Sequence, residues 1–194
     1  MSPSTQHKII LETADIVPIV EKLRQEGKKI VLTQGTFDMV HIGHGRYCHE
    51  AKQQGDVLIV GVDSDEKVKI RKGPDRPVVP ENERMEMLTY LNSVDYVVLK
   101  KKDDEKYNLI KLIKPDVLVA TDQTYTPDKI KYLETICGEV LVLKPLATTS
   151  TSAKIRRVQI GAAQKLTKTL SQRLINTMEE IIEELQNGHE SHRS

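Results

Sequence analysis

The chain has 194 residues, 38% of them hydrophobic and 29% charged, a composition typical of a folded globular protein rather than a disordered one. A formal net charge of +1, 4% aromatic residues and no Trp argue against a general nucleic-acid coat and against stacking platforms for single strands. No apolar stretch reaches the roughly 20 residues of a membrane span, and the N-terminal sequence lacks the apolar run of a secretory signal. The chain has only two cysteines, which fits a reducing compartment. We therefore expect a cytoplasmic protein with no membrane partner.

Five short apolar runs alternate with longer amphipathic stretches along most of the chain. The runs are rich in Val and Ile and lack polar alternation, which is typical of strands buried on both faces of a parallel sheet. Helices are expected at about 13–26 and 45–54, before the first and second runs. The pattern predicts an α/β fold, a Rossmann-like doubly wound parallel sheet of about five strands. The predicted strands cover 30–32, 57–62, 96–99, 117–120 and 140–143.

The C-terminal segment has a different pattern. From about 162 to 186 it contains no Pro or Gly, and apolar residues recur every three or four positions, as on one face of a long helix. That face can pack on its own domain, on a second subunit or on another partner. We expect a domain over 1–158, an amphipathic helix over 159–187 and a flexible tail over 188–194. The apolar positions are Leu166, Leu170, Leu174, Met178, Ile181 and Leu185.

The first candidate site, GTFDMVHIGH at 35–44, follows the first strand. Gly35 allows the backbone to turn and to approach a ligand closely. His41 and His44 lie three residues apart where a helix begins, and a helix N-terminus offers N–H groups and a positive dipole to phosphate. The generic phosphate motifs GxGxxG and GxxxxGK[ST] are absent. A metal site made of both histidines with Cys48 and His49 is the alternative, although a structural zinc site needs four well-placed ligands.

Two further polar segments follow later strands, at the edge where open α/β sheets bind ligands. Residues 69–78, KIRKGPDRPV, place four cations in eight residues of a predicted loop, and Arg84 follows on a helix. Taken alone, these cations could equally be a solvated surface, and Arg84 an ordinary salt-bridge partner. Residues 148–157, TTSTSAKIRR, offer hydroxyl groups that can cap a helix or bind phosphate oxygens.

Together these motifs resemble a known family. GTFDMVHIGH is similar to the signature of the cytidylyltransferase-like nucleotidyltransferases, whose HxGH histidines contact a nucleoside triphosphate. KIRKGPDRPV resembles the K-x-x-K-G-x-x-R-P-V loop of bacterial heptose 1-phosphate adenylyltransferases, and STSAKIR resembles the family's S-T-T-x-x-I motif. The resemblance covers about 8–158. It fails at 120–125, where ATDQTY replaces a K-G-G-D-Y segment near the acceptor and base pockets, so the acceptor and the choice of ATP or CTP stay open.

The resemblance implies transfer of a nucleotidyl group to a phosphorylated sugar, foremost a heptose 1-phosphate, by direct in-line attack with release of pyrophosphate. It implies Mg²⁺ as cofactor, held mainly by substrate phosphates with no protein metal site, and we also expect a homodimer. The implied catalytic residues are His41, His44 and Lys72. The implied nucleotide-binding residues are Gly35, Thr36, Phe37, His41, His44, Arg84, Asp122, Ser150, Thr151 and Ser152, and the acceptor-binding residues are Asp38, Lys69, Lys72 and Arg76.

Other functions share the same motifs. Glycerol-phosphate or other polyol-phosphate cytidylyltransferases and flavin-nucleotide synthetases have the same core, with a different base or acceptor. A protein that senses nucleotides without turnover would also keep the phosphate-binding residues. Pyrophosphate release separates the enzymes from the sensor.

Overall fold

The computed structural model describes residues 6–121, 124–144 and 151–190, with side chains in the last range described from 155 to 181. The chain divides into two compact units, Met1–Thr148 and Thr149–Ser194. The boundary predicted after residue 158 falls inside one continuous helix of the second unit. The two units are described separately below.

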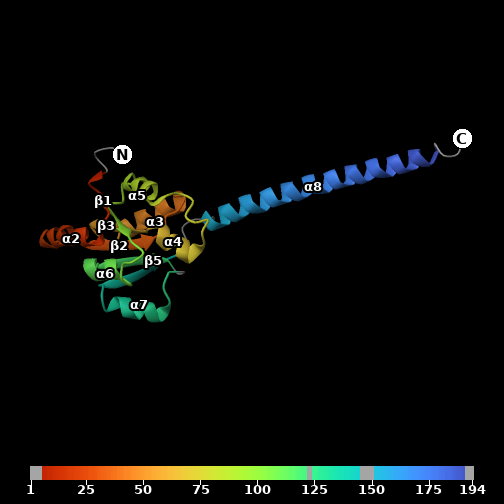
Figure 1. Cartoon of the computed structure of the whole chain (residues 1–194). Helices are drawn as coiled ribbons and strands as arrows, with labels where there is room; N and C mark the ends of the chain where they lie inside the picture. The colour runs from red at the N-terminus through yellow and green to blue at the C-terminus, as the bar shows by residue number, and fades with distance from the viewer. Residues whose placement is uncertain (1–5, 122–123, 145–150, 191–194) are drawn as a thin grey trace. The chain divides into compact units, whose positions relative to one another are not determined.

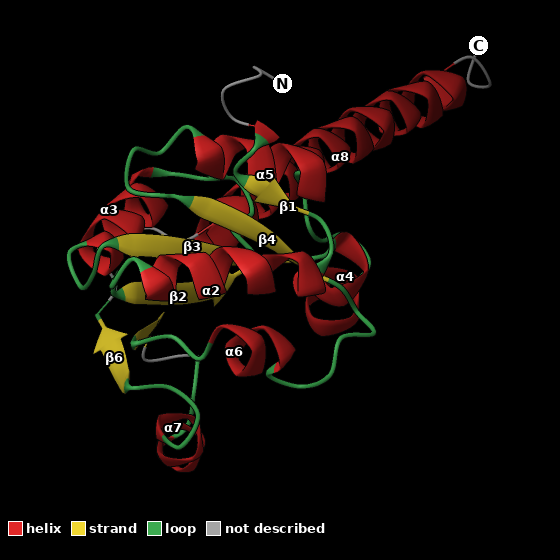
Figure 2. Ribbon diagram, turned by 90° about the vertical axis from the view of Figure 1, so that its left-hand side faces the viewer, coloured by secondary structure: helices red, strands yellow, loops and turns green. Residues whose placement is uncertain are grey.

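The first unit is built on a six-stranded parallel sheet with the order β1-β4-β3-β2-β5-β6 (Figures 1 and 2). The predicted doubly wound parallel sheet is confirmed, with one strand more than expected. That extra strand, β1, has two residues and pairs with β4, so it is too short to form an apolar run in the sequence. The strands are β1 (Ile9–Ile10), β2 (Ile30–Gly35), β3 (Val57–Asp63), β4 (Tyr96–Lys100), β5 (Val117–Thr121) and β6 (Glu139–Leu143).

Helices cover both faces of this sheet, and each face has its own hydrophobic core. Alternate residues of a strand point to opposite faces, so Leu32 and Ile59 join a core with α2 and α6, whereas Val31 and Val60 join one with α3 and α5. In Figure 2, α2 lies in front of β2. A 3-10 helix (Thr13–Asp15) precedes α2. The helices of this unit are α2 (Ile16–Gln25), α3 (Ile42–Lys52), α4 (Asp65–Lys72), α5 (Glu81–Thr89), α6 (Asn108–Ile113) and α7 (Pro127–Glu134).

The strand order reverses at β2, which pairs with β3 on one side and with β5 on the other. In open α/β sheets the crevice beyond the carboxyl ends of the strands at such a reversal is the usual ligand site. The segment containing His41 and His44 follows β2 directly. The fold therefore places the first candidate motif where a ligand is expected.

Residues 69–72 are helical, which corrects the predicted loop over 69–78. They form the end of α4, which begins after Ser64, whose Oγ accepts a hydrogen bond from the backbone N–H of Lys67 at 3.3 Å. Such N-cap residues favour helix initiation, and cations in the last turn suit the negative end of the helix dipole. The helix ends at Gly73, whose φ of 96° lies in a region that favours glycine.

The second unit consists of α8 (Thr151–Glu190), a 40-residue helix. It begins at Thr151, ahead of the predicted 159–187, and it contains Gly161, because a single glycine costs a helix only about 1 kcal/mol relative to alanine. In the described part of the chain, no helix has both the length and the apolar character needed to span a membrane.

Candidate active site

The loop after β2 has an unusual backbone held by one carboxylate. Phe37 and Met39 both have positive φ, 51° and 49°, and they flank Asp38, whose side chain is buried. Asp38 accepts hydrogen bonds from the backbone N–H groups of Val78 and Val79 at 3.0–3.1 Å. Non-glycine residues adopt positive φ at a cost of about 1–3 kcal/mol each, so surrounding contacts must hold this turn in place.

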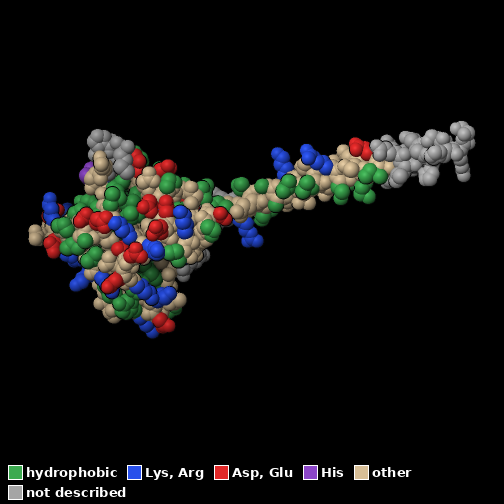
Figure 3. All heavy atoms as spheres, in the orientation of Figure 1, with side chains coloured by type: hydrophobic (Ala, Val, Ile, Leu, Met, Phe, Trp, Pro, Cys, Tyr) green, Lys and Arg blue, Asp and Glu red, His purple; other side chains and the backbone are tan. Residues whose placement is uncertain are grey.

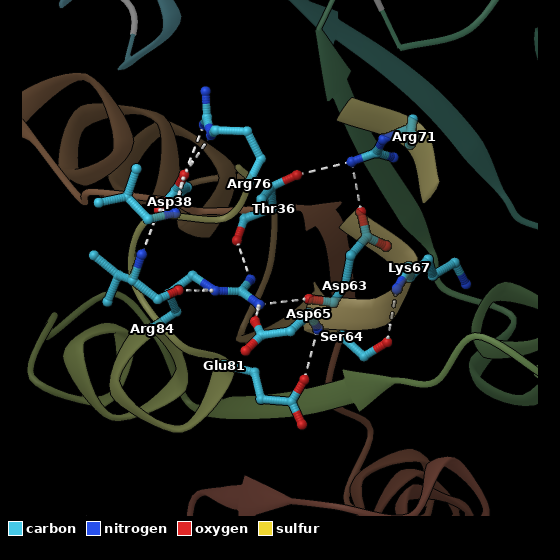
Figure 4. Close-up of polar contacts among 12 residues, drawn as sticks. Thr36, Asp38, Asp63, Ser64, Asp65, Lys67, Arg71, Arg76, Glu81 and Arg84 are labelled. Atoms are coloured by element: carbon cyan, nitrogen blue, oxygen red, sulfur yellow. Dashed lines mark hydrogen bonds and ion pairs between the residues drawn. The ribbon is translucent and has the colours of Figure 1, made fainter. Parts of the chain in front are cut away.

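The same carboxylate pairs with Arg76, one of the residues predicted to bind the acceptor substrate. Asp38 Oδ2 lies 2.9 Å from Nε and 2.6 Å from Nη2 of Arg76 (Figure 4). Burial alone raises the pKa of Asp38, but the backbone N–H groups of Val78 and Val79 and the guanidinium of Arg76 outweigh it and hold that pKa below the usual value. Asp38 is therefore a carboxylate at neutral pH, and it fastens the 73–80 loop to the loop after β2.

His41 and His44 cap α3 with their ring nitrogens. His41 Nδ1 accepts a hydrogen bond from the Gly43 N–H at 3.0 Å, and His44 Nδ1 accepts one from the His41 N–H at 3.3 Å. The two ring centroids are 4.2 Å apart, and the Phe37 ring lies 5.6 Å from that of His44. A neutral imidazole that accepts through Nδ1 carries its proton on Nε2. Both rings therefore have an Nε2–H donor beside the positive end of the helix dipole.

The end of α4 brings cations to this loop. Arg71 donates to the Thr36 side chain at 2.7 Å and to Asp63 at 2.8 Å, which ties α4 to the ends of β2 and β3. Lys72, next along the helix, is exposed, yet partial desolvation lowers its pKa, and the nearby charges of Arg71 and Arg76 lower it further. The structure thus brings Lys72 and Arg76 near the loop after β2. Lys69 lies one turn earlier on α4 and is exposed.

A second ion cluster lies beneath this surface. Asp63, the last residue of β3, is 1% exposed and accepts from Lys100 at 3.0 Å as well as from Arg71. Burial raises the pKa of Asp63, but Lys100 and Arg71 lower it more, so the net pKa is below its usual value. Lys100 ends β4. The pair therefore fixes the ends of two neighbouring strands.

Arg84 is buried at the centre of the same cluster, with 1% of its surface exposed. Its guanidinium donates to the carbonyls of Thr36, Asp63 and Val79, and it pairs with Asp65 at 2.6 Å (Figure 4). These contacts join the ends of β2 and β3 to the loop before α5. They give Arg84 a positioning function, and the nucleotide contact implied by the family resemblance stays a prediction.

Sequence reasoning missed three members of this cluster, Asp63, Asp65 and Lys100. A signal for two of them was available, because Asp63 and Lys100 are charged residues that end otherwise apolar strands. A charge at the carboxyl end of a central strand needs a partner when it is buried. The identity of the partner depends on the strand order, which the sequence does not state.

Several predicted site residues lie outside the described residues or side chains. Asp122 and Ser150 are not described, and Thr151 and Ser152 are described only as part of α8. Their proposed contacts with the nucleotide stay predictions. Gly35 ends β2, and a Cβ there would lie 3.1 Å from the Phe37 ring, so the close packing of this turn favours glycine.

The alternative metal site finds no support in the described residues. No group of three or more His, Cys, Asp or Glu side chains among them could hold a metal ion. Cys48 is fully buried, and burial raises the pKa of its thiol to about 12.

The sequence of the chain matches a known family over most of its length. Residues 32–183 fit the profile of the family described as cytidylyltransferase-like. The chain belongs to the cytidylyltransferase-like family. The predicted family and the prediction of a nucleotidyltransferase domain are thereby confirmed.

Curated relatives of this cytidylyltransferase-like chain include several proteins named bifunctional protein HldE. The protein from Aliarcobacter butzleri is 41% identical over 145 residues, which are 75% of this chain and 30% of the relative. That from Hydrogenovibrio crunogenus is 41% identical over 158 residues, covering 77% and 32%, and that from Nitratiruptor is 48% identical over 112 residues, covering 58% and 24%. The chain thus spans about a quarter to a third of the length of these relatives.

Solved structures share the fold. The lipopolysaccharide core biosynthesis protein from Thermoplasma volcanium matches with a TM-score of 0.55 and 26% identity, over 62% of this chain and 100% of that one. Pantoate–beta-alanine ligase from Francisella tularensis, in complex with beta-gamma ATP and beta-alanine, matches with a TM-score of 0.54 and 18% identity, over 74% of this chain and 69% of that one. The second likeness concerns the fold alone.

Proposed function

We propose that this chain transfers the nucleoside monophosphate of ATP to the phosphate of a sugar 1-phosphate, foremost a heptose 1-phosphate, and releases pyrophosphate. The observation that carries the proposal is the convergence of His41, His44, Lys72 and Arg76 on the loop after β2. Paired imidazole N–H donors, a helix N-terminus and two cations suit a polyphosphate and a second phosphate.

The reaction needs no nucleophilic side chain. An oxygen of the acceptor phosphate, already anionic near pH 7, attacks the α-phosphorus of the triphosphate. A P–O bond forms to the acceptor while the bond from the α-phosphorus to the oxygen bridging it to the β-phosphorus breaks, and that oxygen leaves with pyrophosphate. Catalysis then consists of in-line positioning and stabilisation of the charge that develops in the transition state.

Each residue has a defined task in this scheme. The Nε2–H groups of His41 and His44 donate to the triphosphate. Lys72, assisted by Lys69, lies between donor and acceptor phosphates. Arg76 contributes the guanidinium donors that Asp38 does not engage, since a guanidinium has five N–H groups.

The remaining nucleotide contacts are assigned from the family motifs. Backbone N–H groups of Thr36 and Phe37 face the α-phosphate, and the hydroxyl groups at 150–152 hold the β- and γ-phosphates. The sequence-based task for Asp38, orienting the acceptor or a metal-bound water, is not needed for this scheme. Its contacts with Arg76 and the 73–80 loop support a positioning task instead.

Mg²⁺ fits this proposal as an ion bound to the substrate. The two buried carboxylates of the site, Asp38 and Asp63, are engaged by Arg76 and by Lys100 with Arg71. Such a donor set favours an ion held by phosphate oxygens and water over one held in a protein cage. Bound there, Mg²⁺ would offset charge on the phosphates.

The choice of a heptose rests on three supports. The KIRKGPDRPV segment resembles the loop of heptose 1-phosphate adenylyltransferases, and the relatives at 34–48% identity include many proteins named HldE. The structural relative from Thermoplasma volcanium is named for lipopolysaccharide core biosynthesis. The ATDQTY segment departs from the heptose enzymes, so the acceptor and the base are the parts to test first.

The test is pyrophosphate release with Mg²⁺, with ATP, CTP, GTP and UTP each offered with heptose 1-phosphate, glycerol 3-phosphate and flavin mononucleotide. Release with ATP and heptose 1-phosphate alone supports the proposal. Release with CTP and glycerol 3-phosphate would replace it by polyol-phosphate cytidylyl transfer, and release with ATP and the flavin by flavin-nucleotide synthesis. Nucleotide binding with no release for any pair would favour the sensor.

A further inference from the structure

Arg71 is the most exposed of the ion-paired cations at the carboxyl ends of β2, β3 and β4. Its side chain is 53% exposed. The side chains of Arg76 and Lys100 are 13% and 17% exposed, and that of Arg84 is fully buried. In Figure 3, basic side chains are scattered among acidic ones on the visible face of the first unit. Charge alone therefore identifies no binding residue there, and the contacts of each cation must be compared.

A single nitrogen of Arg71 makes both of its ionic and polar contacts with the sheet. Nη2 donates to Thr36 Oγ1 at 2.7 Å and to Asp63 Oδ2 at 2.8 Å (Figure 4). Both acceptors are buried, and Asp63 is held in turn by Lys100 at 3.0 Å. The guanidinium is thus fixed before a ligand arrives, which lowers the conformational entropy that binding would otherwise cost.

The other donors of Arg71 are available to a ligand. A guanidinium carries five N–H groups, and the contacts of Nη2 leave the Nε–H and the two Nη1–H groups. Within the described part of the chain, these groups have no hydrogen-bond acceptor. A planar set of N–H donors matches the spacing of two phosphate oxygens, which a lysine cannot reproduce.

The position of Arg71 on α4 directs it to the loop after β2. It contacts Thr36, whose backbone N–H is proposed to face the α-phosphate. Lys72 is the next residue along the helix. Lys69 lies about 200° around the helix axis from Arg71, on the opposite side. Arg71 therefore reaches a part of the site that Lys69 does not.

The charges around Arg71 favour an anion. Arg71, Lys72 and Arg76 lie close enough for the first and third to lower the pKa of Lys72, after the larger effect of partial desolvation. The buried carboxylates among them are Asp38 and Asp63, which are paired with Arg76 and Arg71. Lys72 has no ion-pair partner among the described residues, so the group has an excess of positive charge that an anion can offset.

We propose that Arg71 is a further phosphate-binding residue of this site and that its Nε–H and Nη1–H groups bind the phosphate of the acceptor. It comes from the same helix as Lys72, which lies between donor and acceptor phosphates in the proposed reaction. The choice of the acceptor rests on the proposed function, whereas the choice of a phosphate rests on the contacts of Arg71. The competing explanation is that Arg71 only ties α4 to the sheet.

Binding of inorganic phosphate to the full-length chain, measured by calorimetry, tests the assignment. Arg71→Met should raise the phosphate dissociation constant about tenfold or more, because charge-assisted hydrogen bonds are lost. Arg71→Lys can keep the pair with Asp63, so it should unfold in urea like the native chain and still bind phosphate more weakly. The control is Lys67→Met, which removes a cation of the same helix that donates to the Lys101 carbonyl at 3.3 Å, and it should bind phosphate like the native chain.

Native binding by Arg71→Met, or no phosphate binding by the native chain, would overturn the proposal. Full recovery of phosphate binding in Arg71→Lys would favour the structural tie instead. Equal weakening in Lys67→Met would show that only the summed charge of α4 matters, and it would also overturn the proposal.

Arginine modification tests the same assignment without any substitution. Phenylglyoxal should modify the exposed Arg71 of the native chain, and saturating phosphate should slow that reaction, as measured by mass spectrometry. Arg173, which is exposed on α8, should react at the same rate with and without phosphate. An unprotected Arg71 would overturn the proposal even if the variants at this position fail to fold.

Kinetics then separate the acceptor from the nucleotide, with ATP and heptose 1-phosphate as substrates. Arg71→Met should raise KM for heptose 1-phosphate about tenfold or more and leave KM for ATP nearly unchanged. An equal rise in both would overturn the assignment to the acceptor. If the native chain turns over no pair of substrates, the proposed function fails, while phosphate binding and arginine protection still decide whether Arg71 binds phosphate.

Discussion

Two groups of cations occupy the same end of the sheet and differ in what surrounds them. Arg84 and Lys100 lie inside, where carboxylates and backbone carbonyls bind their N–H groups. Lys69 and Lys72 lie exposed at the end of α4, and none of the described residues forms an ion pair with either. A buried cation is stable only when it is paired, whereas an exposed cation is solvated by water and stays available to bind a ligand. The comparison separates the cations that build the site from those proposed to act in it.

The largest expected effect is on stability, at the buried group. Arg84→Met leaves the Asp65 carboxylate and three carbonyls without their donor, and breaking a buried ion pair in this way costs about 3–5 kcal/mol. Urea denaturation measures the loss. The matched control is Lys111→Met, which removes a surface pair with Glu105 and should cost less than about 1 kcal/mol. Equally small losses of stability in both variants would contradict the distinction between buried and exposed cations.

The next effect is on catalysis, at the exposed group. Lys72→Ala and His44→Ala should each lower kcat/KM by about 10²–10³, equivalent to about 2.7–4 kcal/mol, because each removes a donor to a developing charge. Thermal unfolding should be nearly unchanged for Lys72→Ala. Lys102→Ala, which removes another exposed lysine, should keep full activity. Native turnover by both site variants would remove these residues from the proposed mechanism.

An intermediate effect is expected where the two groups meet, at Asp38. Asp38→Asn should destabilise the fold by about 1–3 kcal/mol at pH 7, because Arg76 and two backbone N–H groups lose a carboxylate acceptor. The folded pKa of Asp38 is below its ordinary value of 3.8, so its contribution is complete above that value and is lost as the pH falls through the folded pKa. Stability curves of the native and variant chains should therefore converge in acid. If the difference in free energy of unfolding between the native chain and Asp38→Asn stayed constant down to the lowest pH, the stabilising role of the ionised Asp38 would be contradicted.

The smallest effect is on the alkaline side of the activity profile. The pKa of Lys72 lies below the ordinary 10.5, so its positive charge and the activity that depends on it should decline at a lower pH than an ordinary lysine would allow. Lys72→Arg keeps the charge at all accessible pH values and should move the decline upward. The measurement is the rate of the native chain and of Lys72→Arg across the alkaline pH range, each relative to its own maximum. An unchanged alkaline limb would assign that limb to another group.

The sequence by itself determined the fold class and the family, and it pointed to the candidate site. Apolar runs and helical periodicity are local properties, and they predicted five of six parallel strands and the long C-terminal helix. The GTFDMVHIGH motif is likewise local, and its capping contacts span two or three residues. A pattern confined to neighbouring residues can be recognised without knowing the topology.

Only the tertiary structure decided what the buried charges do. Arg76 reaches Asp38 across 38 positions, and Arg84 reaches the Thr36 carbonyl across 48. The strand β1 exists because β4 offers it an edge. Such contacts arise when parallel strands bring their carboxyl ends to one edge. The strand order decides which residues form these contacts, and no local pattern in the sequence records that order.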